Sequence, residues 1–144
     1  MCARYDINML PRELARRFGI TGPLPPLPCG EVRPTDRVPV ITAARHTAAM
    51  TWGIPAPWDG KPLINARAET LTTKKTFRDL LENRCLVPAS AYFEWRRAGR
   101  ARLKNRIAPE DGEPFAFAGL HDDDGNAFTI ITCAPVPGIA HIHD

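Results

Sequence analysis

The stretch PFAFAGLHDDDGNAFTIITCAP, residues 114–135, contains two β-rich runs on either side of a turn. The runs PFAFAGL (114–120) and AFTIITCAP (127–135) combine aromatic and β-branched residues with small ones, and DDDGN (122–126) has the composition of a tight turn. This pattern predicts a β-hairpin. No regular alternation of strands with helices surrounds it, so a parallel sheet with crossover helices is not indicated.

The rest of the chain also favours short strands over helices. Strands are predicted at VPVITA (38–43), at AAMTWGI (48–54) and along CLVPASAYFEW (85–95), where Pro88 is expected to break the run. Helices are predicted only at PRELARRFG (11–19) and at TFRDLLENR (76–84), the second capped by Thr76, and GPLPPLPCG (22–30) reads as an extended linker. We therefore expect an α+β fold built on an antiparallel or mixed sheet, barrel-like, with a few short helices.

Length and composition are those of one globular domain. The chain has 144 residues, of which 44% are hydrophobic and 24% charged. No apolar run approaches the roughly 18 residues of a membrane span, and the first residues lack the apolar segment of a signal peptide. We expect a cytoplasmic protein with no membrane partner.

The charge pattern permits a nucleic-acid partner without requiring one. The net charge is +3, and six basic residues crowd positions 96–106. This basic run can follow a phosphate backbone, or it can be a solvated surface loop, and the sequence does not favour either interpretation.

Neither the cysteines nor the histidines have metal-site spacing. The four cysteines lie far apart with no Cys-x-x-Cys pair, and Cys85 and Cys133 stand in apolar stretches where buried thiols are expected. His141 and His143 are two apart, but no third ligand is suggested by spacing. We predict no metal site and no organic cofactor, and a histidine here is better used as an acid or base, or is simply a polar residue of the tail.

Cys2 is an unusual residue for the second position of a chain. If Met1 is trimmed, Cys2 carries a free α-amine that titrates near ~8 and a thiol that titrates near ~8.5, so both have a reactive fraction at neutral pH. A 1,2-aminothiol condenses with an aldehyde: the amine forms an imine and the thiol then closes a thiazolidine ring. The alternative is that position 2 varies freely and its cysteine has no role.

Other polar and aromatic residues also admit two interpretations. Glu94 lies between Phe93 and Trp95, and strand alternation alone favours the solvent face over a pocket where its proton affinity would rise. Trp52 and Trp58 can stack on unpaired bases or belong to the core. Arg67 can hold a phosphate or pair with Glu69 on the same face of a strand.

Taken together, four of these stretches resemble the SOS-response-associated peptidase (SRAP) family of abasic-site-processing proteins. They are MCAR (1–4), WGIPAPWDGKPLINARAET (52–70), RCLVPASAYFEW (84–95) and IHD (142–144). They correspond in order to the family's Met-Cys-Gly-Arg, to its Trp-Gly-x-x-Pro followed by Asn-Ala-Arg-x-Glu-Thr, to its Arg-Cys…Pro-Ala…Glu-Trp, and to its Ile-His-Asp. The resemblance spans the chain from end to end.

The resemblance implies specific roles for residues of this chain. Cys2, freed of Met1, would crosslink to the ring-opened aldehyde of an abasic site in single-stranded DNA through a thiazolidine. Asn65 would position the α-amine, Glu94 would move protons, and His143 would act as acid or base beside the sugar oxygen. Residues implied to contact DNA are Arg4 and Arg67 on phosphates, with Trp52, Trp58 and Pro34 lining the strand's channel. The family is also credited with removing the residue ahead of its cysteine.

Two departures from the family pattern affect these expectations. Ala3 replaces the family glycine, and the chain ends at Asp144 where family members continue. We expect a single SRAP domain over residues 1–144 that is incomplete at its C-terminus, with no obligate protein partner. The alternatives are a truncated homologue that only binds single-stranded DNA, and a thiol peptidase acting in trans with Cys2 as nucleophile.

Overall fold

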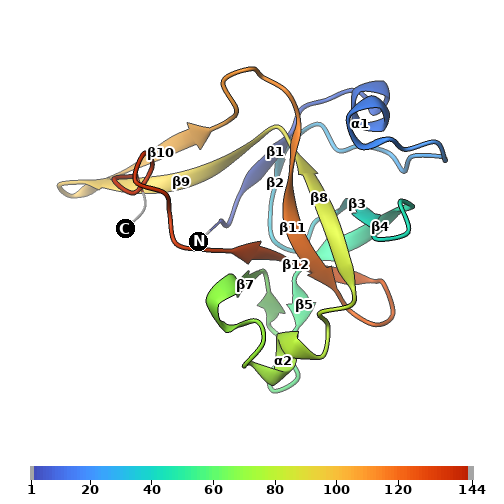
Figure 1. Ribbon diagram of the computed structural model, residues 1–144. Coiled ribbons are helices and arrows are strands. Elements are labelled where there is room, and N and C mark those ends of the chain that lie inside the picture. Colours follow the sequence, from blue (N-terminus) through green and yellow to red (C-terminus); the bar gives the residue numbers. More distant parts are fainter. Residues whose placement is uncertain (1, 143–144) are drawn as a thin grey trace.

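Five strands close into a barrel in the computed structural model, which describes residues 2–142. Figure 1 shows how they are arranged. Around the barrel the order is β11 (Phe115–His121), β8 (Arg84–Ala89), β3 (Arg37–Thr42), β4 (Thr47–Trp52) and β12 (Ala127–Thr132), and β12 pairs again with β11. Only the β12–β4 contact is parallel among these pairings. The predicted β-rich, barrel-like α+β fold is confirmed.

The predicted hairpin forms two neighbouring strands of this barrel. β11 and β12 pair antiparallel with Gly119 opposite Ile130. The turn between them is tied by Asp122, whose Oδ1 accepts hydrogen bonds from the backbone N–H of Asn126 at 2.7 Å and of Ala127 at 3.2 Å. An aspartate that binds the backbone ahead of it is the turn chemistry that the sequence indicated.

A second, four-stranded sheet carries the N-terminal strand. Its order is β10 (Ala101–Ile107), β9 (Ala91–Ala98), β1 (Tyr5–Ile7) and β2 (Gly30–Val32), and every pairing in it is antiparallel. β9 and β10 continue beyond β1 as a long hairpin that extends away from the barrel (Figure 1).

The predicted break of the strand at Pro88 is wrong. β8 continues through Pro88, and the chain passes to the second sheet two residues later. Pro88 lies opposite Ala116 of β11. On its other side β8 pairs with β3 only at Cys85 and Leu86, so at Pro88 the strand has a partner on one side only and a missing N–H is tolerated. At Ser90 the backbone N–H instead bonds to the carbonyl of Asp6 in β1 at 2.8 Å.

The remaining elements are short. They are α1 (Pro11–Phe18), β5 (Ile54–Pro55), β6 (Pro62–Leu63), β7 (Asn65–Arg67), the 3-10 helix η1 (Ala68–Thr70) and α2 (Lys75–Arg78). α1 agrees with the predicted helix and ends at Gly19, whose φ of 64° is the left-handed cap that glycine favours. No regular element lies between α1 and β2, as the proline-rich linker predicted.

The second predicted helix is much shorter than expected. α2 has four residues, follows Lys74 rather than a Thr76 cap, and gives way to turns before Asn83. The predicted apolar side of this segment is confirmed. Phe77 is buried against Ala66 and Leu120, and Leu80 and Leu81 pack beside it. Burial of these side chains anchors the segment, and so short a stretch has little helix stability of its own.

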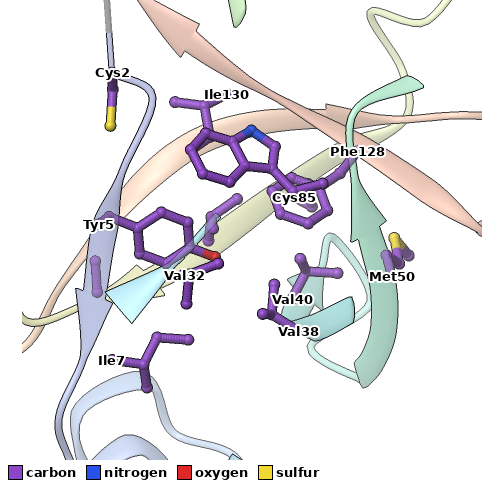
Figure 2. Packing of buried hydrophobic residues seen from close by; sticks show 13 residues of the cluster. Cys2, Tyr5, Ile7, Val32, Val38, Val40, Met50, Cys85, Phe128 and Ile130 are labelled. Atoms are coloured by element: carbon purple, nitrogen blue, oxygen red, sulfur yellow. The ribbon is translucent and has the colours of Figure 1, made fainter. Parts of the chain in front are cut away.

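The main core lies between the barrel and the second sheet. Tyr5 of β1, Trp52 of β4 and Phe128 of β12 are its largest buried side chains. The rings of Tyr5 and Trp52 meet edge to face with centroids 5.1 Å apart. Figure 2 shows Cys2 at one end of this cluster, next to Tyr5 and Ile130. The N-terminal segment is therefore fixed by the same packing that joins the two sheets.

Candidate functional site

A cavity of about 330 Å³ opens beside Cys2, where β7, β9, β11 and β12 converge. Its wall is formed by Cys2, Arg67, Tyr92, Glu94, Ile107, residues 115–117, residues 131–136, Ile139 and Ile142. Three of the residues that the sequence singled out, Cys2, Arg67 and Glu94, therefore share one cavity.

The Cys2 thiol is buried in the wall of the cavity. Its side chain is 5% exposed, and Sγ donates a hydrogen bond to the carbonyl of Arg4 at 3.4 Å. Burial raises the pKa of Cys2 to about 12, and the negative charge of Glu94 acts in the same direction. The expected thiolate fraction at neutral pH assumed a solvated thiol, and burial lowers that fraction in the folded chain.

Asn65 holds the backbone of Cys2. The parallel pairing of β7 with β12 sets Asn65 opposite Ile130, and Asn65 Nδ2 donates to the carbonyl oxygen of Cys2 at 2.7 Å. Its Oδ1 is buried and has no hydrogen-bond partner among the described residues. A buried acceptor without a donor is unfavourable, so this oxygen is available to a nearby N–H group.

Glu94 faces the cavity rather than solvent. β9 pairs with β1 so that Tyr92 lies opposite Tyr5, and Tyr92 and Glu94, two residues apart, both line the cavity. The prediction from strand alternation that Glu94 faces solvent is therefore wrong. Burial, with smaller effects from Glu94 and Cys2, raises the pKa of Tyr92, so its hydroxyl stays protonated.

Both arginines expected to bind phosphate are paired with carboxylates. Arg67 Nε lies 3.3 Å from Glu69, whose Oε1 also accepts a hydrogen bond from the backbone N–H of Ala134 at 3.1 Å. Arg4 donates to Glu31 at 2.8 Å, and Lys104 donates to the other oxygen of the same carboxylate. The hydrogen bond from Lys104, with a contribution from Arg4, lowers the pKa of Glu31.

The residues expected to line a DNA channel are not gathered at the cavity. Trp52 is fully buried and its Nε1 donates to the carbonyl of Ile64 at 2.9 Å, so its assignment to a strand-binding surface is wrong and it belongs to the core. Trp58 is 67% exposed in the loop between β5 and β6. Pro34 is half-buried between β2 and β3, and neither Trp58 nor Pro34 lines the cavity.

The predicted acid or base, His143, lies outside the described residues, and His141 is exposed.

Within residues 2–142 no three His, Cys, Asp or Glu side chains are grouped closely enough to hold a metal ion. The same part of the chain contains no helix with the length and apolar character needed to span a bilayer.

Three residues of the cavity were not predicted as parts of a site. Thr132 lies opposite Arg67 on β12, lines the cavity, and has a buried Oγ1 without a hydrogen-bond partner among the described residues. Tyr92 lies two positions before Glu94 on the same strand. Residues with this spacing share one face of a strand, so Tyr92 could have been predicted to line the cavity together with Glu94. Cys133 is exposed and lines the cavity, which corrects the expectation of a buried thiol; its apolar neighbours in the sequence gave the wrong signal.

Comparison with known proteins supplies a family. The model of the family described as SOS response associated peptidase (SRAP) matches residues 1–144. The chain is 32% identical over 164 aligned positions to the abasic site processing protein YoqW of Bacillus subtilis, covering 100% of this chain and 73% of that protein. It is 33% identical over 161 positions to the abasic site processing protein YedK of Escherichia coli, covering 100% of this chain and 72% of that protein.

The fold has also been seen in solved structures. A crystal structure of a protein from Bacteroides thetaiotaomicron superposes with a TM-score of 0.82 at 26% identity, covering 98% of this chain and 72% of that one. A phage-related protein from Bordetella bronchiseptica superposes with a TM-score of 0.80 at 24% identity, covering 99% of this chain and 74% of that one. The barrel and its attached sheet are thus an arrangement shared with other proteins.

Proposed function

The chain belongs to the SOS response associated peptidase (SRAP) family, and on that premise we propose that it processes abasic sites in DNA by capturing their aldehyde with Cys2. The observation that carries this proposal is the arrangement around Cys2. Its thiol forms part of the wall of a cavity that Glu94 also lines, and Asn65 holds its carbonyl. An abasic sugar in its ring-opened form presents an aldehyde, the electrophile that a 1,2-aminothiol traps.

The first step is attack by the α-amine of Cys2 after Met1 has been removed, a removal that we propose as the chain's own peptidase activity. Asn65 Nδ2 fixes the Cys2 carbonyl, and the unpartnered Oδ1 of the same amide accepts a hydrogen bond from the amine. In this proposal the two contacts hold the amine in place beside the cavity. Loss of water then gives an imine between the sugar and Cys2.

The second step is closure of the ring by the thiol. The Cys2 thiol is neutral at physiological pH because burial raises its pKa to about 12, so it must lose its proton as it adds to the imine carbon. Glu94, a carboxylate in the same cavity wall, is the group that accepts and returns this proton. Ring closure removes the imine that would drive strand cleavage by elimination. His143 remains a proposed acid or base beside the sugar oxygen.

We propose that the DNA backbone is held by Arg67 and Arg4, each of which a phosphate would have to share with its carboxylate partner. Trp58 supplies an exposed aromatic face for an unpaired base, and Pro34 contributes to the path of the strand. Single-stranded DNA with an abasic site is the proposed partner. We expect the protein in the cytoplasm, and at the nucleoid while bound.

The test is a denaturing gel of the purified protein mixed with single-stranded DNA that carries one abasic site. Intact mass first establishes that Met1 is absent. A heat-stable shifted band that needs both the lesion and Cys2 is expected, so intact DNA and Cys2→Ala give none. No band from a folded protein with free Cys2 would reject capture and leave the alternative of a protein that only binds DNA.

The alternative of a thiol peptidase acting in trans has less support. The Cys2 thiol is 5% exposed and its pKa is raised to about 12, so the backbone of an added peptide would have to reach a buried and protonated nucleophile. Such an enzyme would also work with Met1 in place. Cleavage of an added peptide by a variant that retains Met1 is the result that would favour this alternative.

A further inference from the structure

The cavity beside Cys2 is more apolar than a sugar-phosphate requires. Beyond the polar groups its wall is formed by ten apolar residues, which include Ile107, Phe117, Ile131, Val136 and Ile139. The volume of about 330 Å³ is more than twice the roughly 150 Å³ that encloses benzene in an apolar protein cavity. The space is therefore suited to a small hydrocarbon group, which a deoxyribose does not supply.

Polar groups without partners lie in the same region. Thr132 Oγ1, in the cavity wall, and Asn65 Oδ1, on the side chain that holds Cys2, are both buried and have no hydrogen-bond partner among the described residues. Asn65 Oδ1 is the acceptor proposed above for the α-amine of Cys2, so Thr132 Oγ1 is the atom left for the polar end of a ligand, because buried polar atoms are normally satisfied. The apolar wall, Thr132 and the neighbouring Cys2 together describe a molecule with one polar, reactive end and a hydrocarbon body.

We propose that the protein captures small apolar aldehydes that are free in solution, as a second class of substrate. This inference rests on the proposed function in one respect: Cys2 must carry a free α-amine. The carbonyl carbon of the aldehyde reacts at Cys2, the oxygen is held by Thr132 during the first addition, and the hydrocarbon occupies the apolar cavity. Aliphatic aldehydes of about six carbons and benzaldehyde are the compounds that fit.

The reaction needs no oxidant or other reagent. The α-nitrogen bonds to the carbonyl carbon to give a carbinolamine, which loses water to form an imine. Sγ of Cys2 then bonds to the same carbon, and the thiol proton passes through Glu94 to the nitrogen. The products are the thiazolidine and one molecule of water. An aldehyde bound in this way blocks both groups that would capture an abasic site.

The apolar wall should make the protein select apolar aldehydes over polar ones, beyond the general reactivity of an N-terminal cysteine. Any N-terminal cysteine reacts with aldehydes, so the comparison is with the tripeptide Cys-Ala-Arg, which repeats residues 2–4 without the cavity. The ratio of rate constants for hexanal and glycolaldehyde should be at least about tenfold higher in the protein, the factor expected from burying on the order of 50 Å² of hydrocarbon surface.

The experiment follows thiazolidine formation by intact mass with Met1-free protein and with the tripeptide, using hexanal, benzaldehyde, glycolaldehyde and glyceraldehyde. Val136→Asp places a charge at the cavity wall, and Val136 is 62% exposed, so folding should be retained. Leu103→Asp is the matched control, since Leu103 is 43% exposed on β10 and does not line the cavity. We expect Val136→Asp to reduce the selectivity toward that of the tripeptide and Leu103→Asp to leave it unchanged.

The outcomes separate this inference from the function on which it rests. Equal selectivity in protein and tripeptide, or selectivity that Val136→Asp does not change, overturns the inference. If the same preparation still crosslinks to abasic DNA, the proposed function survives that result. If the tripeptide reacts but the protein reacts with neither aldehydes nor abasic DNA, Cys2 is inaccessible and both proposals fail.

Discussion

At the scale of single residues, the site depends on contacts between segments that are distant in the sequence. Asn65 is 63 positions from Cys2, and its amide nevertheless holds the Cys2 carbonyl at 2.7 Å. Because this contact fixes the atoms next to the reactive amine, a small displacement of it should slow imine formation strongly. The adjacent thiol is buried, and burial raises its pKa to about 12.

Replacing Asn65 should slow crosslinking much more than it destabilises the protein. In Asn65→Ala the Cys2 backbone loses its donor, and we expect the initial rate of crosslinking to abasic DNA to fall by about ten- to a hundredfold. The control is Asn83→Ala, which removes a side-chain hydrogen bond to Asp123 at 2.7 Å at a position that does not line the cavity. A rate for Asn65→Ala equal to that of Asn83→Ala would remove Asn65 from the mechanism.

The sequence identified individual residues better than their surroundings. Cys2, Arg67 and Glu94 were predicted as parts of one site and do line one cavity. The strand pattern of Trp52 fits an inward-facing and an outward-facing tryptophan equally, and the resemblance then assigned it wrongly to the DNA channel. The pairing of Arg4 with Glu31, 27 positions away, follows from the register of β1 with β2, which no local pattern specifies.

At the scale of elements, tight corners bring the strands of the site into place. Gly53 joins β4 to β5, has a φ of 122°, and donates its N–H to the carbonyl of Phe128 at 2.8 Å. A Cβ added there would meet Pro62 Cβ at 2.5 Å. The short pairing of β5 with β6 therefore requires glycine at this corner for two reasons, its backbone angle and the lack of space.

Substituting this glycine should be clearly more harmful than substituting one with a positive φ alone. Gly60 has a φ of 71° and no atom within 4 Å of an added Cβ, so Gly60→Ala bears only the backbone cost of about 1 kcal/mol. Gly53→Ala adds a clash and should lower the free energy of unfolding by about 2–4 kcal/mol in denaturant titrations. Equal losses in the two variants would show that the corner relaxes freely.

The β9–β10 hairpin is an exposed element that the sequence could not interpret. Its register sets Arg102 opposite Arg97, Lys104 opposite Trp95 and Arg106 opposite Phe93, so cations and aromatic rings share one face. Lys104 Nζ lies 4.0 Å from the centre of the Phe93 ring. Phe93 is buried, and Lys104 and Arg106 are paired with Glu31 and Asp6, so the cations of this hairpin that a phosphate backbone could reach are those toward its tip, such as Arg100 and Arg102.

Charge reversal on the hairpin distinguishes these two interpretations. In the double variant Arg100→Glu, Arg102→Glu, the affinity for an undamaged single strand should fall about tenfold at low salt. The slope of log affinity against log salt should weaken by about 0.7 for each phosphate that the protein no longer neutralises. Arg12→Glu, Arg45→Glu carries the same change of charge on α1 and on the β3–β4 turn. Equal affinities for the two double variants would show that the hairpin does not bind the strand and is a solvated surface.

At the scale of the whole molecule, the site is completed only when barrel and second sheet are joined. Cys2 precedes β1 and Glu94 belongs to β9, in the second sheet. Thr132 belongs to β12 of the barrel, and Asn65 belongs to β7, which pairs with β12. Composition and strand patterns predicted a barrel-like fold and the β11–β12 hairpin, but not the pairing of β11 with β8, of β12 with β4 or of β9 with β1, because these pairings join segments that are distant in the sequence. That residues 1–144 form a single domain stays a prediction.

The stability of the whole molecule should decline in alkali because of two buried thiols. Burial raises the pKa of Cys2 and of Cys85 to about 12. The unfolded chain ionises these thiols near ~8.5, so their contribution is fully present below that pH and is lost as the pH rises toward 12, at about 1.4 kcal/mol per pH unit for each thiol. Denaturant titrations should give a loss of about 2 kcal/mol per thiol at pH 10.

Two substitutions isolate the thiol contribution from other alkaline effects. Cys85→Ala should be less stable at pH 7.5 because it leaves a cavity, yet its stability should fall less steeply with pH than that of the unaltered protein. Cys29→Ala removes an exposed thiol and should leave the slope unchanged. If Cys85→Ala keeps the original slope, the buried thiol is not the cause of the alkaline loss.

The most direct measurement of the central claim is the bond structure of the crosslink to abasic DNA. The crosslinked protein is digested with nuclease and protease, and the adduct is located by tandem mass spectrometry after treatment with a thiol-alkylating reagent. We predict a sugar remnant on Cys2 with the loss of one water and with both its nitrogen and its sulfur blocked, so that the reagent adds nothing. An adduct that still accepts the reagent at Cys2, or one located on Cys133 or a lysine, would contradict capture by the aminothiol of Cys2.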